Sequence, residues 1–355
     1  MTMLAETVDA VIGIDTHRDS HEVEIADPAG RPIAVMQIGN DSAGFTRLLA
    51  AIADVVPGPR VAVCIEGSRS YGIGLARALA AAGLLVLECE QPSRRQRRGK
   101  GKSDPIDAHL AVLTALRLDA GRLPVPRADG DREALRILLV ARQEITGACT
   151  AQAGRLRALL LAGDDTDRRA ARTTLSGRAL AALADREVPG HASREQAVRQ
   201  AETGRLALAL TQARRQLKDN RARLLAIVDD IAPGLTSRYG VGPVSAAQAI
   251  VSFSHPGRCR SEAAFATLGG TSPLPASSGQ TVRHRLNRGG DRALNRAIHA
   301  IALVRMRSCP RTRAYVARRT AEGKTMREIR RCLKRYIARE LYRQLTRSMN
   351  PPVSP

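Results

Sequence analysis

The sequence has 355 residues, of which 44% are hydrophobic, and its 56 Lys and Arg against 34 Asp and Glu give a formal net charge of +22. No run of about 18 apolar residues is present, which excludes a membrane-spanning chain, and the length predicts two or three folded domains. The N-terminus lacks the order of a signal peptide, and six scattered cysteines without a CxxC pair indicate neither a zinc site nor a disulfide framework. We therefore expect reduced thiols and a cytoplasmic protein.

The positive charge is concentrated toward the C-terminus. Residues 1–125 carry a net charge of −1, residues 126–230 carry +5 and residues 231–355 carry +18. Such a gradient predicts a polyanionic partner at the C-terminal end, the alternative being a basic surface that only confers solubility. With five Tyr, three Phe and no Trp, stacking platforms for single strands are not expected. Contacts should run mainly from Arg to phosphate and weaken with salt.

The first 125 residues predict an α/β domain. Short apolar or alternating runs predict strands, and apolar residues at helical spacing predict helices. Hairpin-connected strands followed by strand–helix units indicate a mixed sheet with flanking helices. The expected strands are 8–15, 21–26, 32–38, 61–65 and 84–87, and the expected helices are 42–55, 73–82 and one that begins at Asp104.

A basic loop precedes that last helix. Six of the nine residues in RRQRRGKGK, at 94–102, are basic. We interpret the segment as a loop that contacts phosphate, and a solvated loop is the alternative. The residues concerned are Arg94, Arg95, Arg97, Arg98, Lys100 and Lys102.

The remaining chain predicts helices. Patterns at 131–162 and 193–231, separated by Gly, Asp and Pro at 163–167 and 188–190, predict a helical hairpin. It could form a coiled-coil arm for self-association, or a plain pair of helices. Gly240-Val241-Gly242 before a helix from Pro243 is typical of a helix-hairpin-helix element whose backbone N–H groups face a phosphate, although a helix start without a ligand is the alternative. Further helices are expected at 293–306 and 324–347.

Four carboxylates occupy positions that could form one site. Asp15 ends the first predicted strand, Glu66 follows the fourth, and Asp104 and Asp107 open the helix after the fifth, on one helical face. If the first and fourth strands are neighbours, their ends bring Asp15 and Glu66 together. Oxygen ligands without a His or Cys cluster suit Mg²⁺ or Mn²⁺, and two such ions support phosphoryl transfer.

Each carboxylate also has an ordinary structural interpretation. Ser103 or Asp104 could cap the helix, with Pro105 in its first turn and Asp107 near the third position. Asp15 and Glu66 could be turn residues at strand ends. His17 and His109 lack metal-ligand spacing and are expected to be polar surface residues.

A serine pair lies in a polar loop followed by arginines. Ser277 and Ser278 precede Gly279, and a hydroxyl that attacks phosphorus needs positive charge around the phosphate and a backbone that can approach it. A Ser/Gly turn is the alternative. The arginines that could supply this charge and bind nucleic acid are Arg283, Arg285, Arg288 and Arg292.

Taken together, Asp15, Glu66, "KSDPIDA", "GVGPVSAAQAI" and "FATLGGTSPLPASSGQTVRHRLNRGGDRALNRAIHAIA" resemble the insertion-sequence transposase family IS110 over nearly the whole chain. The resemblance implies an RuvC-like domain of RNase H fold at 1–125, a coiled-coil arm at 126–231 and a C-terminal transposase domain at 232–350. It also implies that Asp15, Glu66, Asp104 and Asp107 bind metal and that Ser278, or Ser277, forms a transient phosphoserine link to DNA.

The same resemblance implies partners. Family members act as homo-oligomers, and a dimer or tetramer is expected, with composite sites from two subunits. A structured noncoding bridge RNA pairs with donor and target DNA and would carry sequence choice. Two alternatives stay open: a metal-dependent endonuclease or junction resolvase without a covalent intermediate, and a non-catalytic basic nucleic-acid-binding protein.

Overall fold

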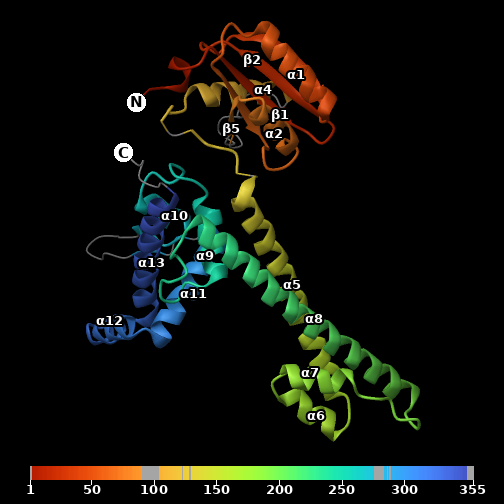
Figure 1. Cartoon of the computed structure of the whole chain (residues 1–355). Coiled ribbons are helices and arrows are strands. Elements are labelled where there is room, and N and C mark those ends of the chain that lie inside the picture. The colour runs from red at the N-terminus through yellow and green to blue at the C-terminus, as the bar shows by residue number, and fades with distance from the viewer. Residues whose placement is uncertain are drawn as a thin grey trace. The chain divides into compact units, whose positions relative to one another are not determined.

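The computed structural model describes residues 2–89, 104–121, 123–127, 129–275, 284–285, 287 and 289–349. The chain forms two compact units (Figure 1). The first contains residues 1–133 and 253–265, and the second contains residues 134–252 and 266–355.

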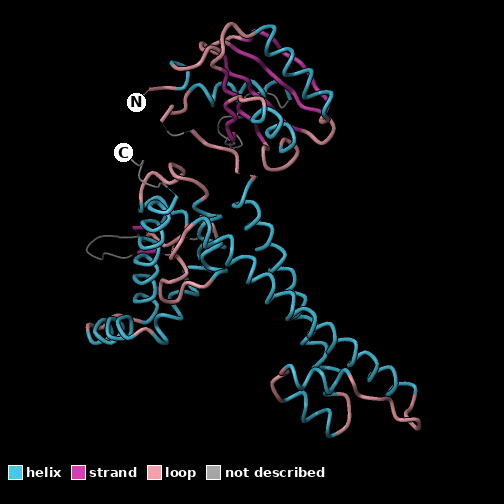
Figure 2. The backbone as a smooth tube through the Cα atoms, viewed as in Figure 1, coloured by secondary structure: helices cyan, strands magenta, loops and turns pink. Residues whose placement is uncertain are grey.

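The first unit is built on a five-stranded mixed sheet with the order β3-β2-β1-β4-β5, whose strands are magenta in Figure 2. β1 pairs antiparallel with β2 and β2 with β3, whereas β1–β4 and β4–β5 are parallel. The predicted neighbourhood of the first and fourth strands is therefore confirmed, and the fold is the expected RNase H-like arrangement. The strands are β1 Ala10–Thr16, β2 Ser20–Ala26, β3 Pro32–Gly39, β4 Val61–Glu66 and β5 Leu85–Cys89.

Helices cover both faces of this sheet. On one face, Ile14 of β1 and Ile65 of β4 pack in a core with Leu48 and Leu75, which belong to α1 (Ser42–Val55) and α2 (Ile73–Ala81). Asp41 caps α1 by accepting a hydrogen bond from the Gly44 amide at 2.7 Å. A short 3₁₀ helix, η1 (Leu4–Glu6), adds Leu4 to the core of the opposite face.

The opposite face is covered by α4 (Asp104–Leu116), which lies unusually close to β1. A Cβ atom at Gly13 would fall 2.1 Å from the Ala108 carbonyl oxygen and 2.7 Å from a methyl group of Val112. Only a residue without a side chain allows this approach. Gly13 therefore sets the depth at which the first turns of α4 rest on the sheet.

The second unit is mainly helical. The predicted hairpin is present as α5 (Gly130–Leu161), most of which lies in this unit, and α8 (Arg194–Ile231). The Asn220 amide donates to the Leu138 carbonyl at 2.8 Å, and at the other end Leu156 and Leu206 share a core, so the two helices run antiparallel. A buried amide bonded across two helices favours one register over others. Coiled-coil supercoiling stays a prediction.

Two short helices that the sequence analysis did not identify close the far end of the hairpin. They are α6 (Asp165–Arg172) and α7 (Gly177–Ala184), and Leu180 and Leu183 of α7 are buried against α8. Asp164 and Ser176 provide their N-caps, as short polar side chains do when they accept from the first free amides.

The C-terminal part contains the expected helices at 243, 293 and 324 and two that were not predicted, α10 and α12. α11 and α13 pack through Ile298, Ile301, Leu333 and Ile337, all buried. Among the described residues, no helix is both long and apolar enough to cross a membrane. The elements are α9 Pro243–Phe253, α10 Glu262–Leu268, β6 Leu274–Pro275, β7 His284–Arg285, α11 Arg292–Ser308, α12 Pro310–Ala321 and α13 Met326–Met349.

A Gly13→Ala substitution should destabilise the first unit by about 1–3 kcal/mol, because the added methyl group overpacks the contact between β1 and α4. Urea unfolding followed by circular dichroism measures this. Gly74→Ala in α2 is the matched control, since its Cβ would meet only Phe45 ring atoms at 3.4 Å. Equal stability of the two variants would contradict the close approach of α4.

Candidate active site

The C-terminal ends of β1 and β4 carry two of the predicted carboxylates side by side. The last paired residues of these parallel strands are Ile14 and Ile65, and Asp15 and Glu66 follow them directly. Neighbouring strands lie about 4.8 Å apart. The Thr16 hydroxyl donates a hydrogen bond of 2.7 Å to the Glu66 carbonyl, which ties the two strand ends together.

Both carboxylates belong to the sheet face that α4 covers. Side chains two residues apart in a strand share a face, so Asp15 lies on the face of Gly13, and Glu66 on the face of Cys64. Gly13 abuts α4, and Cys64 packs in the same core as Ala111 and Val112 of α4.

The third carboxylate, Asp107, comes from α4 itself. It precedes Ala108, whose carbonyl faces Gly13, and it lies one helical turn before the buried Ala111. Asp15 and Glu66 are each 7% exposed and Asp107 is 9% exposed. The structure thus brings three of the four predicted acids to one sheet face, at the end where the parallel strands stop.

Asp104 opens α4, one turn before Ala108, but its side chain lies outside the described part of the structure. Among the residues that are described, no three His, Cys, Asp or Glu side chains already form a group that could hold a metal ion. The donor set nevertheless fits a hard divalent cation, because buried carboxylate oxygens on one face repel each other unless a cation neutralises them.

Histidines contribute more to this face than the sequence analysis expected. His17 and His109 were expected to be polar surface residues, but His17 Nε2 lies 3.3 Å from Asp15 Oδ2. His109 Nδ1 lies 2.6 Å from Oε1 of Glu24, which is 5% exposed. Both side chains are partly exposed, as polar surface residues are, and the structure adds a carboxylate partner to each.

Glu24 is an acidic residue that the sequence analysis missed. It lies opposite Gly13 in the register of β1 and β2, and therefore on the face covered by α4. The alternating run HEVEIA, at 21–26, predicted a strand but did not indicate what covers its polar face. The presence of a glycine opposite Glu24 was the available signal that a helix lies over this position.

The turn after Glu66 is shaped by glycines. Gly67 has a positive φ of 74°, and a Cβ at Gly72 would lie 2.8 Å from Thr16 and 2.9 Å from Ile65. The Ser70 amide donates to the Gly67 carbonyl at 2.8 Å. These contacts hold the loop after Glu66 close to the ends of β1 and β4.

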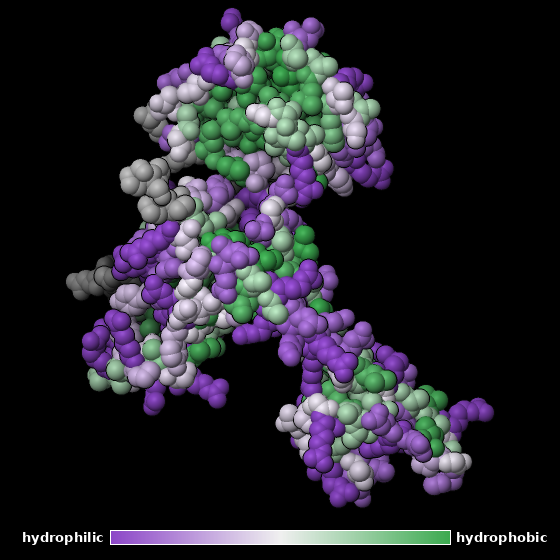
Figure 3. Space-filling view, viewed as in Figure 1, coloured by the Kyte–Doolittle hydropathy of each residue, from purple (hydrophilic) through white to green (hydrophobic). Residues whose placement is uncertain are grey.

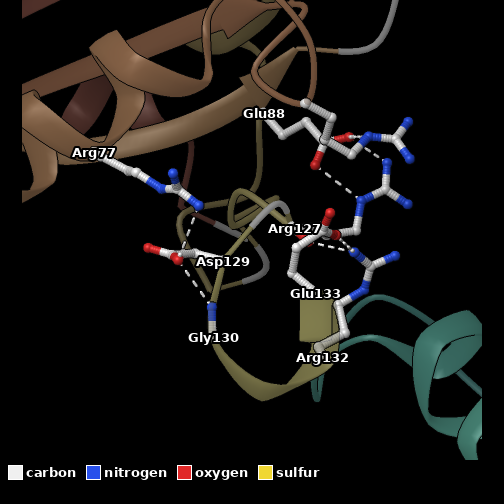
Figure 4. A network of polar contacts seen from close by, with 8 residues as sticks. Arg77, Glu88, Arg127, Asp129, Gly130, Arg132 and Glu133 are labelled. Atoms are coloured by element: carbon white, nitrogen blue, oxygen red, sulfur yellow. Dashed lines mark hydrogen bonds and ion pairs between the residues drawn. The ribbon is translucent and has the colours of Figure 1, made fainter. Parts of the chain in front are cut away.

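A buried ion-pair network fixes the neighbouring strand (Figure 4). Glu88 of β5 is 6% exposed and accepts hydrogen bonds from the Arg127 guanidinium, one of them 2.8 Å long. Arg69, from the loop after Glu66, lies 3.0 Å from the same carboxylate. Burial alone would raise the pKa of Glu88, but Arg127 and Arg69 hold the pKa below its usual value.

The network continues to the start of α5. The Arg132 guanidinium donates to the Arg127 carbonyl, and burial together with the Arg127 charge lowers the pKa of Arg132 to about 10. The Glu88 amide also donates to the Pro124 carbonyl at 2.8 Å. The strand end, the loop from β4 and the beginning of α5 are therefore held by one carboxylate.

The basic loop of residues 94–102 lies outside the described residues, as do Ser277, Ser278, Arg283 and Arg288. The segments that flank the serine loop are described. Leu274 pairs with Arg285, of which only the backbone is described, and Pro275 pairs with His284. Arg292 is exposed in the first turn of α11.

Two glycine pairs, Gly269-Gly270 and Gly289-Gly290, lie in close contact at the base of this hairpin. A Cβ at Gly290 would lie 2.3 Å from the Leu268 carbonyl, to which the Asp291 amide donates at 2.7 Å. The Asn295 amide donates to the Gly269 carbonyl at 2.6 Å, and the buried Lys334 ammonium donates to Asn295 at 2.7 Å. The chain thus enters and leaves the serine loop at fixed positions.

The predicted Gly240-Val241-Gly242 turn packs against a helix. Gly240 has a φ of 77°, and its Cβ would lie 3.3 Å from the Ile301 carbonyl of α11. Gly242 is more open, with only Arg221 within 4 Å. Packing therefore accounts for Gly240, and phosphate binding at this turn stays a prediction.

Comparisons with known proteins agree with this arrangement. A DEDD transposase family model of IS110, described as "Transposase", matches residues 12–162. A second, described as "Transposase IS116/IS110/IS902 family", matches residues 232–317. The chain is also similar to the insertion element IS110 uncharacterized 43.6 kDa protein of Streptomyces coelicolor, with 26% identity over 371 residues that cover 90% of each chain.

Glu88→Gln should lower the stability of the first unit by about 1–3 kcal/mol near neutral pH, because the largely buried Arg127 loses its charged acceptor. A carboxylate whose folded pKa is lowered stabilises the protein above its unfolded pKa, close to 4.5, and this contribution disappears as the pH falls through the folded pKa. The difference in melting temperature between the wild type and the variant should therefore shrink below that pH.

Glu202→Gln is the matched control, since Glu202 also pairs with an arginine but is exposed. Its melting temperature should stay close to that of the wild type at every pH. A Glu88→Gln variant that behaves like this control would contradict the structural role of the network.

Proposed function

Because the chain belongs to the IS110 family of insertion-sequence DNA transposases, we propose that it cuts and rejoins DNA through a transient phosphoserine intermediate at a carboxylate-bound metal site. The observation that carries the proposal is the convergence of Asp15, Glu66 and Asp107 on one face of an RNase H-like sheet. A net charge of +22 suits a partner made of phosphodiesters.

The DEDD domain suggests dependence on a divalent metal. We propose that Asp15, Glu66, Asp104 and Asp107 hold Mg²⁺ or Mn²⁺. When bound, such ions stabilise negative charge on the oxygens of a reacting phosphate. While these acids serve as metal ligands, they do not act as general bases. The Thr16 hydroxyl and the glycine turn after Glu66 hold their backbone in place.

The covalent step is proposed for Ser278, with Ser277 as the alternate. Its Oγ gives up its proton and attacks phosphorus, so that a serine–phosphorus bond forms while the bond from phosphorus to the 3′-oxygen breaks and that oxygen leaves as a 3′-hydroxyl. A 3′-hydroxyl of the new partner then reverses the step. The number of phosphodiester bonds is conserved, so no nucleotide hydrolysis is needed.

Charge in the C-terminal region supports this chemistry. Arg283, Arg285, Arg288 and Arg292 flank the serine loop in sequence and would offset charge on the transferring phosphate. The hydrogen bonds at the base of the hairpin hold both ends of the serine loop in place. Arg94 to Lys102, together with Gly240 and Gly242, would contact the phosphate backbone outside the reacting position.

We further propose the domain division 1–125, 126–231 and 232–350, with the middle region as an arm for self-association. The working unit would be a dimer or tetramer in which one subunit supplies the carboxylates and another the serine. A structured noncoding guide RNA would pair with donor and target DNA and choose the sites. The protein would act at the nucleoid in the cytoplasm.

A second candidate is a metal-dependent endonuclease or junction resolvase that uses water in place of serine. It is favoured by one observation: Asp15, Glu66 and Asp107 all belong to the first unit, so this chemistry would need no residue of the second. Denaturing gels that reveal protein covalently attached to DNA distinguish the two, because hydrolysis leaves no adduct. A non-catalytic binding protein would keep its activity when Asp15 and Glu66 are replaced.

Ser278→Ala should lower strand exchange by at least about 10³-fold and abolish the covalent adduct, because the attacking oxygen is removed. DNA binding measured by gel shift should stay within about twofold of the wild type, a loss of less than ~0.5 kcal/mol. Ser277→Ala is the matched control and should recombine. If the control loses activity and Ser278→Ala keeps it, the nucleophile is Ser277.

Asp15→Asn and Glu66→Gln should weaken Mn²⁺ binding by about 10–100-fold or more, measured by titration calorimetry, and should abolish strand exchange. Asp19→Asn changes the charge equally at an exposed position paired with Arg18, and should bind Mn²⁺ like the wild type. Normal Mn²⁺ affinity in both Asp15→Asn and Glu66→Gln would rule out the carboxylate metal site.

A further inference from the structure

The second unit contains a groove that none of the proposed chemistry uses. Its larger part has a volume of about 1030 Å³ and its smaller part about 260 Å³, and both are lined by Arg238, Tyr336 and Glu340. The walls are formed by α12, by residues 333–347 of α13, by the end of α11 and by the turn before α9, which all belong to one compact unit. We call it the tyrosine–arginine groove.

Aromatic side chains are concentrated here. The whole chain has five Tyr, three Phe and no Trp, and three of these tyrosines, Tyr239, Tyr315 and Tyr336, line the larger part of the groove. Tyr239 is 48% exposed and Tyr336 is 52% exposed. The low aromatic content of the whole chain, from which no stacking platform was expected, therefore does not reflect this one local cluster of tyrosines.

The rings are held in place. Tyr315 and Tyr336 meet edge to face, with ring centroids 6.1 Å apart and planes at 87°. Such pairs are favourable because the positive edge of one ring meets the negative face of the other. Tyr336 is thus an exposed ring whose orientation is supported from behind, which is what a stacking surface requires.

Positive charge surrounds these rings. Arg311, Arg318 and Arg343 line the groove, and the Arg318 guanidinium lies 5.6 Å from the centroid of the Tyr315 ring. Glu340, an acid in the lining, is bound by Arg305 at 2.7 Å, so its charge is largely compensated. Figure 3 shows many hydrophilic side chains over α12 and α13 on the visible face.

We propose that the tyrosine–arginine groove binds an unpaired nucleotide segment, with a base stacked on Tyr336 and the adjoining phosphates on the arginines. Exposed aromatic faces bind bases only when these are not paired within a duplex, whereas arginines alone would accept any phosphate backbone. A groove that combines both selects single strands. None of the carboxylates or serines proposed for strand exchange lines this groove, and binding there does not depend on their chemistry.

The test compares Tyr336→Leu with Tyr336→Phe in the full chain, using a fluorescently labelled 12-nucleotide strand and anisotropy. Loss of one stacked base should weaken binding of the single strand about tenfold with leucine. Phenylalanine keeps the ring and should bind within about twofold of the wild type, a difference below ~0.5 kcal/mol. Tyr71→Leu is the control of equal exposure, 52%, outside the groove, and should not change the affinity.

Strand chemistry gives the second readout. The wild type should bind a strand with abasic positions about tenfold more weakly than the intact strand. Tyr336→Leu should bind the two strands with equal affinity. RNA and DNA strands of one sequence are compared, and the tighter one identifies the occupant. Equal affinity of Tyr336→Leu and wild type, equal loss in Tyr71→Leu, or competition by duplex DNA as strong as by single strands would overturn the proposal.

Discussion

The close approach of α4 to β1 at Gly13 is the contact on which the arrangement of the buried acids depends. A helix that rests on a sheet through a side chain stays several ångströms further away, whereas here the Ala108 carbonyl occupies the space of the missing Cβ atom. Asp107 is carried by the same turn of α4, so its height above the sheet is set by this contact. Asp15 and Glu66 reach the same face because their strands are paired in register. Backbone packing, more than any side-chain contact, thus brings the acids together.

Further hydrogen bonds and ion pairs hold the segments that carry the proposed site residues. The Thr16 hydroxyl joins the ends of β1 and β4, and Arg69 connects the loop after Glu66 to Glu88 on the next strand. In the second unit, Asn295 and Lys334 hold the base of the hairpin that carries the serines. Each reactive segment is therefore connected to regular secondary structure on both of its sides.

Much of the fold was predictable because it depends on short-range signals. Apolar strands separated by turn residues located β1 to β5 within about two residues, as such boundaries usually allow. The partner of His109 was not predictable, because Glu24 meets α4 only through tertiary packing. The short helices α6, α7 and α10 were not predicted, because seven or eight residues are too short a window to show a helical period. The gathering of Tyr239, Tyr315 and Tyr336 also arises from three separate segments.

The paired backbone at Leu274 and Pro275 opposite Arg285 and His284 fixes both ends of the serine loop at neighbouring positions. A loop with anchored ends changes in free energy by only about 0.6 kcal/mol for each doubling of its length. Insertions, deletions and replacements between these anchors are therefore nearly free of cost to the core. The fold therefore tolerates changes of loop length, whereas the serines and arginines proposed for the chemistry constrain which residues the loop carries.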